Sequence, residues 1–493
     1  MKHIVTILLL LSVGGSSFGQ FKLQGHIDHL KEDQQLVVNT PFVYGYAQAM
    51  DLPLATDKDG NFSVVLPLSE EKVGYLRWGD HQAFLWMKPG SDLTVELDGY
   101  DDEITFGGAM AEANALLHKL ELHKAPLFFA DGKRVAAGEM QDSVIQPYMK
   151  QLAAKKRMIE ANSLLPSEKE FLNAELHYHF IVYIDWYVRT ARWPRSEWSD
   201  FIIEFMQGET PQPKSALHGP MYYSFIDAYV GFLASQAFSN RDNPTRFAES
   251  LDSVYGVSDF DSLMSMAREH GETSLNWMAV KRAFDPSTTE RYLAKHVKEK
   301  YDDGEVSTGN YLLDALESHN RHSTYLDTLV RIRASLMEKM AAVNHEIIIP
   351  DDYRTFEQIT AFVKQFRGKV VYLDIWGTWC GPCKEEMRYL PPLKQHFEGE
   401  DMVFLYLDMD DDDHDSKWRE YIQANGITGV HLRKNNEDIQ SIWKELLPDD
   451  VSRHGRYPTY FIFDKNGNLV ADDIQRPSAG KDLITQLEKY LNQ

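Results

Sequence analysis

The chain has 493 residues, enough to bury two or three separate hydrophobic cores, and a formal net charge of −23 at pH 7. So acidic a composition argues against nucleic acid or an anionic membrane as the principal partner. Only two cysteines are present, so no structural disulfide can form without consuming that pair.

Residues 1–19 have the organisation of a secretory signal peptide. A short basic start with Lys2 leads into an apolar run from Ile4 to Val13, and small residues follow up to Gly19, before Gln20. This run is shorter than the ~20 apolar residues that cross a bilayer, and no later segment is apolar enough. We therefore expect a bacterial protein that is periplasmic or otherwise exported and does not span a membrane. The alternative is a buried N-terminal strand or helix.

Residues 20–106 alternate apolar and polar residues between turn signals such as Lys88–Asp92. This pattern predicts strands joined by tight turns, most simply a small β-sandwich that serves as an accessory domain. The acidic segment Asp57–Asn61 is too short for a calcium-binding EF-hand loop, which favours a hairpin turn.

Residues 107–345 show the three- and four-residue apolar spacing of helices, for example in Ala111–His123 and Phe171–Arg192. His177 and His179 lie two apart on a predicted helix and point in different directions, which disfavours one shared metal ion. A group of aromatic residues is expected to be core, with a peptide-binding groove as the alternative: Phe180, Tyr183, Trp186, Tyr187 and Trp193.

Residues 346–493 alternate strands and helices, which predicts a mixed sheet covered on both faces. Ser478 is expected to cap the final helix. The acidic run Asp408–Asp415 follows a predicted strand. A solvated loop is the favoured interpretation of this run, and a calcium site is the alternative.

The two cysteines stand in the tetrapeptide Cys380-Gly381-Pro382-Cys383, between an apolar strand pattern and a helical pattern. A strand that delivers a Cys-x-x-Cys pair to a helix N-terminus is the arrangement that lowers a thiol pKa. Cys380 is therefore expected to be the nucleophile, and Cys383, one turn into the helix, the resolving thiol. Half of a zinc site is disfavoured, because a structural zinc needs four ligands and no second cysteine pair exists.

The motif Trp376–Lys384 resembles a thioredoxin active site, and Tyr457–Phe463 resembles the cis-proline strand that faces it in that fold. The long span between the two motifs, together with Glu386, resembles the exported TlpA/ResA-like branch. The β-rich N-terminal region is similar to a domain often placed ahead of such domains. This resemblance implies a multidomain protein with a C-terminal α/β thioredoxin-like fold at 346–493, after the small β-sandwich and the helical region.

The resemblance also implies roles for residues around the cysteine pair. Asp374 and Glu386 would handle the proton of Cys383, and Pro458 would be the cis-proline. The alternatives are an acid that only ends a strand and an exposed helix glutamate. Phe404 departs from the pattern, because thioredoxin has a lysine there. The residues implied to contact substrate are Trp379, Gly381, Pro382 and Tyr457.

The expected function is an exported thiol–disulfide oxidoreductase that reduces protein disulfides, with cytochrome c maturation as one possible pathway. The couple itself would serve as redox centre, with no separate cofactor and no metal. Its partners would be protein thiols or disulfides and an electron-donating membrane thiol reductase, with no nucleic acid. The alternatives are a disulfide oxidase or isomerase, or a partner-binding protein whose thioredoxin domain is regulatory.

Overall fold

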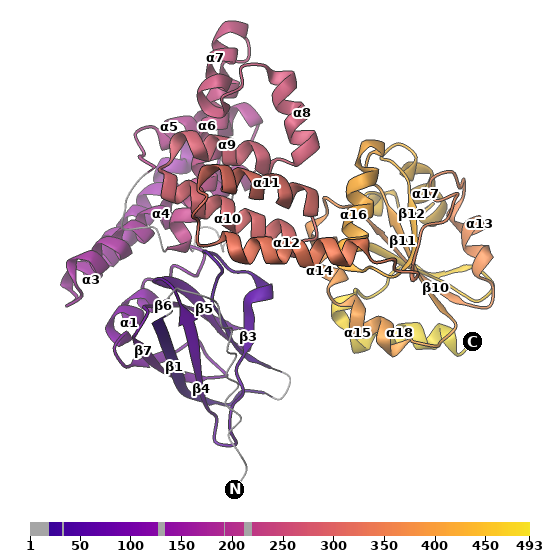
Figure 1. The fold of residues 1–493 in the computed structure, drawn as a ribbon, viewed down its shortest axis with the longest axis horizontal. Coiled ribbons are helices and arrows are strands. Elements are labelled where there is room, and N and C mark those ends of the chain that lie inside the picture. Colours follow the sequence, from indigo (N-terminus) through magenta and orange to yellow (C-terminus); the bar gives the residue numbers. More distant parts are fainter. Residues whose placement is uncertain (1–18, 32–33, 127–133, 192, 212–218) are drawn as a thin grey trace. The chain divides into compact units, whose positions relative to one another are not determined.

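A computed structural model describes residues 19–31, 34–126, 134–191, 193–211 and 219–493 (Figure 1). The expected signal peptide lies outside these residues except for Gly19. Two compact units are present: residues up to His296 with Asp314–Ser323 form unit 1, and Val297–Leu313 with Thr324–Gln493 form unit 2. Within the described ranges, no helix combines the length and apolar character needed to cross a membrane.

The N-terminal part of unit 1 consists of two four-stranded sheets, with strand orders β4-β1-β7-β8 and β3-β2-β5-β6. On β1, Phe21 and Leu23 are buried while Lys22 between them is exposed, which is the alternation expected of a strand with one face in a core. The predicted β-rich fold is thus confirmed. Its strands are β1 Gly19–Asp28, β2 Leu36–Asn39, β3 Asp51–Pro53, β4 Asn61–Leu68, β5 Lys72–Trp78, β6 His81–Met87, β7 Asp92–Asp98 and β8 Ile104–Gly107.

The acidic segment Asp57–Asn61 forms a tight turn, because Asp57 Oδ1 accepts hydrogen bonds from the backbone N–H groups of Asp59 and Asn61, both at 2.9 Å. The expected hairpin is wrong in one respect. The turn joins β3 and β4, which belong to different sheets. It therefore carries the chain from one sheet to the other.

Helices follow the sheets, as the apolar spacing predicts. His179 is buried and bonds to Tyr148, whereas His177 bonds to Glu209 at 2.9 Å, so the two histidines have different partners. The helices are α1 Ala111–Lys119, α3 Gln146–Ala161, α4 Pro166–Thr190, α5 Arg195–Met206, α6 Pro220–Ser239, α7 Pro244–Tyr255, α8 Phe260–His270, α9 Thr273–Ala283, α10 Pro286–Asp302, α11 Val306–His319 and α12 Leu326–Ala341.

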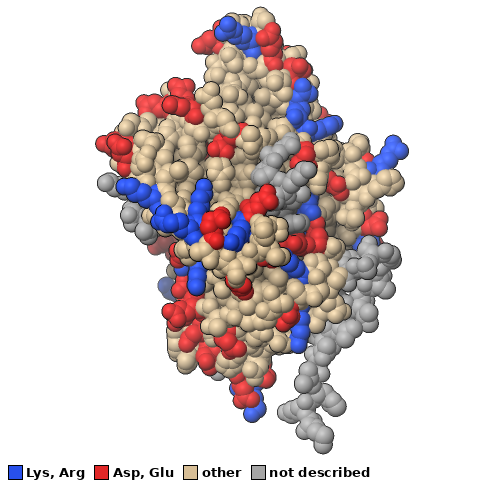
Figure 2. All heavy atoms as spheres, turned by 90° about the vertical axis from the view of Figure 1, so that its left-hand side faces the viewer, with Lys and Arg blue, Asp and Glu red and all other residues tan. Residues whose placement is uncertain are grey.

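On the face drawn in Figure 2, Lys and Arg side chains are interspersed with Asp and Glu. Ion pairs within unit 1 include Arg77 with Asp51 at 3.1 Å and Lys88 with Glu168 at 2.7 Å. Basic side chains on this face therefore have acidic neighbours rather than forming a continuous basic stripe.

Unit 2 contains a six-stranded mixed sheet of order β14-β13-β10-β11-β12-β9. The central strand β10 runs parallel to β11 and antiparallel to β13, as predicted for a mixed sheet. The elements are β9 Ile347–Ile348, β10 Val370–Trp376, β11 Met402–Asp408, β12 Gly429–Arg433, β13 Thr459–Phe463, β14 Leu469–Ala471, α13 Ile359–Val363, α14 Gly381–Met387, α15 Leu390–His396, α16 Asp415–Asn425, α17 Ile439–Leu446 and α18 Lys481–Leu491.

Helices cover both faces of this sheet. Val371, Leu373 and Ile375 of β10 pack with α13 and α17, whereas Tyr372 and Trp376 pack in the cluster that includes side chains of α14, α15, α16 and α18. Because side chains alternate along a strand, Asp374 belongs to the second face. That face also holds both cysteines. Complete burial of an apolar side chain such as Val371, Leu373 or Ile375 contributes roughly 1.5–3 kcal/mol to the free energy of folding.

Candidate functional site

The two cysteines lie where the wholly buried strand β10 leads into helix α14. Cys380 is the residue before the first helical residue, Gly381, and its sulfur accepts a hydrogen bond from the backbone N–H of Cys383 at 3.2 Å. Pro382 occupies the first turn, where its missing N–H costs no helical hydrogen bond. A disulfide joins Cys380 to Cys383, with side chains 3% and 0% exposed. Both sulfurs are engaged in this bond, so the structure holds the pair as an oxidised couple.

Asp374 is enclosed on the same face of the sheet. It is 1% exposed, and its register partners on the neighbouring strands are Tyr406 and Tyr460. Burial raises the pKa of Asp374 to about 8, helped by the negative charge of Glu386 and opposed by the positive charge of Lys394. Its Oδ1 has no hydrogen-bond partner among the described residues. Asp374 therefore lies inside strand β10 and does not end it.

Glu386 is held in place by hydrogen bonds and is not an exposed helix residue. It is 7% exposed, and its carboxylate accepts from the backbone N–H and the hydroxyl of Ser478 at 2.9 and 3.0 Å. The expected role of Ser478 as a helix cap is wrong, because Gly480 occupies the cap position of α18. Ser478 instead lies in a short 3₁₀ turn before that helix and fixes Glu386.

The start of β13 lies beside the redox motif. The Tyr457–Pro458 peptide bond is cis, and the rings of Tyr457 and Trp379 meet edge to face with centroids 5.5 Å apart. Trp379 is 58% exposed, whereas Tyr457 is partly buried against the cluster that contains both cysteines. Gly381 and Pro382 are also exposed. This group forms a partly apolar surface beside the nearly buried disulfide.

Comparisons with known proteins agree with this geometry. Residues 355–487 match the model of the Redoxin family. The thiol-disulfide oxidoreductase ResA of Bacillus thuringiensis subsp. konkukian is 30% identical over 130 residues, and that of Bacillus anthracis is 31% identical over 129. Residues 355–487 form a TlpA/ResA-like thioredoxin-fold domain.

These alignments cover 26% of this chain, and the chain spans 65% of the length of either relative. Among solved structures, the thioredoxin domain of a thiol-disulfide oxidoreductase from Bacteroides vulgatus matches with 22% identity and a TM-score of 0.22. That match covers 26% of this chain and 83% of that one. All of unit 1 lies outside residues 355–487.

A partly buried lysine from another element lies beside Phe404. Lys394, on α15, places its Nζ 5.0 Å from the centre of the Tyr406 ring and 5.4 Å from that of Phe404. The same Nζ bonds to the backbone oxygen and hydroxyl of Thr428. Burial lowers the pKa of Lys394 to about 7, opposed by the charge of Asp374. The sequence carries no clear signal for this residue, because its proximity depends on how α15 packs.

The expected solvated acidic loop after β11 is wrong for its first residues. Asp408 and Asp410 are 0% and 1% exposed, and only Asp411–Asp413 face solvent. Asp410 accepts hydrogen bonds from the backbone N–H of Thr378, at 3.0 Å, and from its hydroxyl. Two acids of this run are therefore structural, and Asp410 fixes the loop that precedes Cys380 in the TlpA/ResA-like domain.

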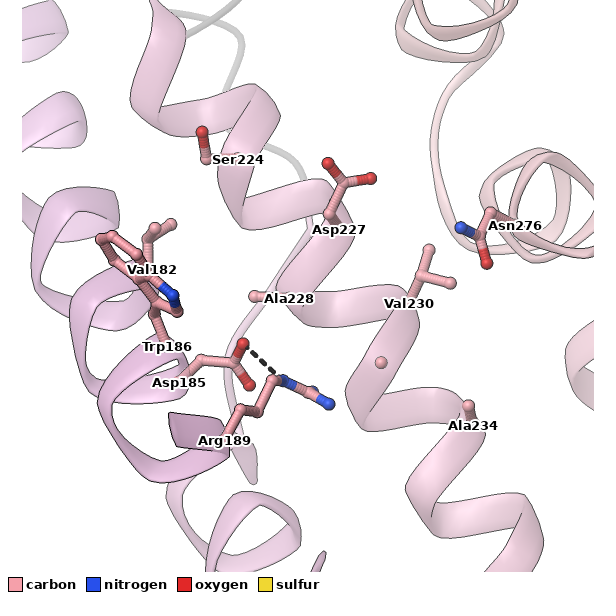
Figure 3. A pocket seen from close by; sticks show the side chains of 11 residues that line it. Val182, Asp185, Trp186, Arg189, Ser224, Asp227, Ala228, Val230, Ala234 and Asn276 are labelled. Carbon is pink, nitrogen blue, oxygen red and sulfur yellow. Dashed lines mark hydrogen bonds and ion pairs between the residues drawn. The ribbon is translucent and has the colours of Figure 1, made fainter. Parts of the chain in front are cut away.

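A second candidate site is a pocket of about 410 Å³ in unit 1, between α4, α6 and α9 (Figure 3). Asp185 lines it and accepts a hydrogen bond from Arg189 Nε at 2.8 Å. Trp186 also lines it and is 48% exposed, unlike the buried Phe180 and Tyr187 of the predicted aromatic core.

Proposed function

We propose that this chain is a thiol–disulfide oxidoreductase that reduces the disulfides of other proteins. The observation that carries the proposal is the oxidised Cys380–Cys383 couple at the start of α14, on the face of the sheet that also holds Asp374. The unpaired N–H groups of the first helical turn stabilise a thiolate on Cys380 in the reduced form.

The reaction consists of two exchanges. The Cys380 thiolate attacks one sulfur of the substrate disulfide, which forms a mixed disulfide and releases the other sulfur as a thiolate that takes a proton from water. Cys383 then loses its proton and attacks the Cys380 sulfur. This step breaks the mixed disulfide, releases the second substrate sulfur as a thiolate that takes up a proton, and restores the Cys380–Cys383 bond. Two electrons pass to the substrate, and a dithiol donor that is itself oxidised to a disulfide must regenerate the reduced couple.

Asp374 is the proposed acceptor of the Cys383 proton. Because its pKa is about 8, the deprotonated fraction that can act as a base grows as the pH rises from 7 to 8. Glu386, fixed by Ser478, adds a negative charge that helps to keep this pKa high. Tyr457 and Trp379 offer an apolar edge for the substrate chain around its disulfide, next to Pro458.

The reducing direction is supported by the Gly-Pro dipeptide between the cysteines, which resembles that of reducing members of the fold. We expect a reduction potential below about −200 mV, nearer thioredoxin than the strongly oxidising periplasmic proteins. Equilibration of the full chain with glutathione redox buffers measures this value. A potential near about −120 mV would reverse the assignment and favour a disulfide oxidase.

The substrate class can be tested by trapping. Cys383→Ala removes the resolving thiol, so mixed disulfides through Cys380 should accumulate and should disappear after treatment with a dithiol. The matched control is Cys380→Ala, which keeps the buried thiol and should trap little. Equal trapping by the two variants would contradict the assigned roles.

Export is part of the proposal and is supported by the composition of residues 1–19. The matching donor would be a membrane thiol reductase that presents a dithiol outside the cytoplasm, and cytochrome c maturation is one pathway that needs such reduction. Blocking export while following the redox state of Cys380 and Cys383 by alkylation tests this. If the Cys380–Cys383 couple is equally reduced in the exported and the retained protein, no separate electron donor outside the cytoplasm is needed.

Docking of a partner by unit 1 is a second candidate function, supported by the pocket next to Trp186. Trp186→Ala should slow reduction of the physiological protein substrate and leave reduction of a small disulfide unchanged. Equal rates for wild type and variant on both substrates would defeat this role of the pocket.

A further inference from the structure

The turn between α10 and α11 is fixed to the helices around the redox couple, although it lies outside residues 355–487. Both sets of residues belong to unit 2. The backbone N–H and hydroxyl of Ser307 donate to Glu420 of α16. Asn425 of α16 donates to the backbone oxygen of Asp303 at 3.2 Å. A segment from the helical region is therefore an integral part of the redox unit.

The same turn places a carboxylate on the lysine that follows Cys383. Lys384 Nζ lies 2.8 Å from Glu305 Oε1 and 5.0 Å from the centre of the Tyr421 ring. The side chains of Lys384 and Glu305 are 17% and 29% exposed. Glu305 also binds Lys300, at 2.7 Å through its other oxygen. Burial raises the pKa of Glu305, but Lys384 and Lys300 together lower it further, so the carboxylate is ionised at neutral pH.

Lys384 is well placed to influence the sulfur of Cys380. Its backbone N–H donates to the carbonyl of Cys380 at 3.1 Å, so the two residues are four apart on one helical turn. Cys380 is the N-cap residue of α14 and Lys384 follows one turn later, so the ammonium and the sulfur belong to the same short stretch of chain. An uncompensated ammonium there would stabilise a Cys380 thiolate and hence the reduced couple, which makes a couple more oxidising. The ion pair with Glu305 draws the ammonium away and cancels part of its field.

We propose that Glu305, a residue outside the thioredoxin fold, tunes the redox couple by neutralising Lys384 and so keeps Cys380 a weaker acid and the couple more reducing. Glu305 is thus a positioning residue that acts through Lys384 and does not touch substrate. The inference rests on the proposed oxidoreductase function, since it assigns a direction to the tuning of that couple.

Other charged groups on the elements around α14 also act on the electrostatic potential at Cys380. A substitution of Glu305 leaves these groups in place. Glu386 is held by Ser478, and Arg388 lies 3.6 Å from Asp303. The charged groups on these elements include Asp374, Glu385, Glu386, Arg388, Lys394, Asp410, Asp415, Lys417, Arg419, Glu420, Arg476, Lys300, Asp303 and Glu305. An isosteric change at Glu305 removes one charge from this set while conserving the shape of the side chain.

The experiment compares Glu305→Gln with Glu420→Gln in the full chain carrying Cys383→Ala, so that one thiol titrates. The rate of alkylation of Cys380 by iodoacetamide is followed against pH. Glu305→Gln should lower the apparent pKa of the Cys380 thiol by about half to one unit, since the pair is only partly enclosed. Glu420→Gln replaces one of the two oxygens that accept from Ser307 in the same turn but leaves the Glu305–Lys384 pair, so it should leave the pKa of Cys380 unchanged.

A third variant isolates the role of Lys384. In the Lys384→Gln background, Glu305→Gln should shift the pKa of the Cys380 thiol by less than half as much. The ammonium that Glu305 neutralises in wild type is absent there. With both cysteines present, Glu305→Gln should shift the equilibrium with a thiol buffer about three- to tenfold toward the dithiol. Added salt should shrink the difference between Glu305→Gln and wild type.

The outcomes separate this inference from the proposed function. An unchanged pKa in Glu305→Gln, or equal shifts in Glu305→Gln and Glu420→Gln, would overturn the tuning role and indicate only a structural contact. Alkylation needs no protein substrate. A chain that shows the expected shift but reduces no protein disulfide would therefore defeat the proposed function and leave the tuning by Glu305 standing.

Discussion

Arg433 and Asp408 form an ion pair that is enclosed in unit 2. Arg433 Nε lies 2.7 Å from Asp408 Oδ2, and the two side chains are 3% and 0% exposed. Arg433 also donates to the backbone oxygens of Asp410 and Asp411 at 3.1 and 3.0 Å. Because Asp410 in turn holds Thr378, this arginine links the ends of β11 and β12 to the loop before Cys380.

Removal of Arg433 should be costly. Arg433→Met leaves the carboxylate of Asp408 buried without its cation, which typically costs about 3–5 kcal/mol. The matched control is Arg419→Met, whose ion pair with Asp415 at 2.8 Å involves a side chain 42% exposed and should contribute below about 1 kcal/mol. Hydrogen exchange of the β10 and β11 amides in urea measures both. If the two variants lose similar amounts of unfolding free energy, the buried Arg433–Asp408 pair contributes no more to stability than the exposed Arg419–Asp415 pair.

Asp374 should make stability depend on pH. Its pKa is 3.8 in an unfolded chain and about 8 in the fold, so between those values the folded state holds a proton that the unfolded state has released. Stability from this group is therefore lost as the pH rises from about 4 to 8.

The asparagine in Asp374→Asn cannot ionise, so this variant should not lose stability in that pH range through this position. Its unfolding free energy relative to wild type should rise by about 2–4 kcal/mol between pH 5 and pH 8. Urea denaturation of the oxidised proteins at both pH values measures the change. Lys394, whose pKa is lowered to about 7, contributes to stability with the opposite sign above pH 7. A constant difference between the two proteins would exclude a raised Asp374 pKa.

Trp379 should contribute to recognition of protein substrates and little to the chemistry. Its ring is 58% exposed and is supported by Tyr457. Trp379→Ala should lower kcat/KM for a protein disulfide about five- to tenfold, which corresponds to loss of one apolar contact of roughly 1 kcal/mol. Turnover of a small aromatic disulfide serves as the control and should change less than twofold. An equal loss on both substrates would assign Trp379 to the redox chemistry itself.

Several features could be predicted from the sequence because the signals are local. Cys380 and Cys383 are separated by only two residues, and the apolar run before them has the length and composition of a buried strand. Asp374 lies on that strand, so its burial follows from the same pattern. Pro458 is far away in sequence, but its place was given by a motif resemblance. These residues define the couple and its immediate support.

Other features depend on contacts between distant segments, which no local pattern reveals. Ser478 has the composition of a helix cap, yet its partner is Glu386, 92 residues earlier. Asp410 looked like part of a solvated acidic run, but Thr378 and the end of β12 enclose it. Glu305 lies in the predicted helical region 107–345, yet in the structure it pairs with Lys384 beside the redox couple. In each case the packing of helices against the sheet, and not residue type, decides the environment.

Lys394 supplies the positive charge that opposes the raised pKa of Asp374. Lys394→Met should therefore raise that pKa further and shift the pH at which Cys383 resolves a mixed disulfide at half its maximal rate upward by about half to one unit. The matched control is Lys465→Met, because Lys465 Nζ also bonds a backbone carbonyl of unit 2, that of Leu491. Single-turnover release of a labelled protein thiol from the mixed disulfide, between pH 6 and 9, gives the profile. If Lys394→Met lowers the rate equally at every pH, the lysine supports the fold but does not act on the proton of Asp374.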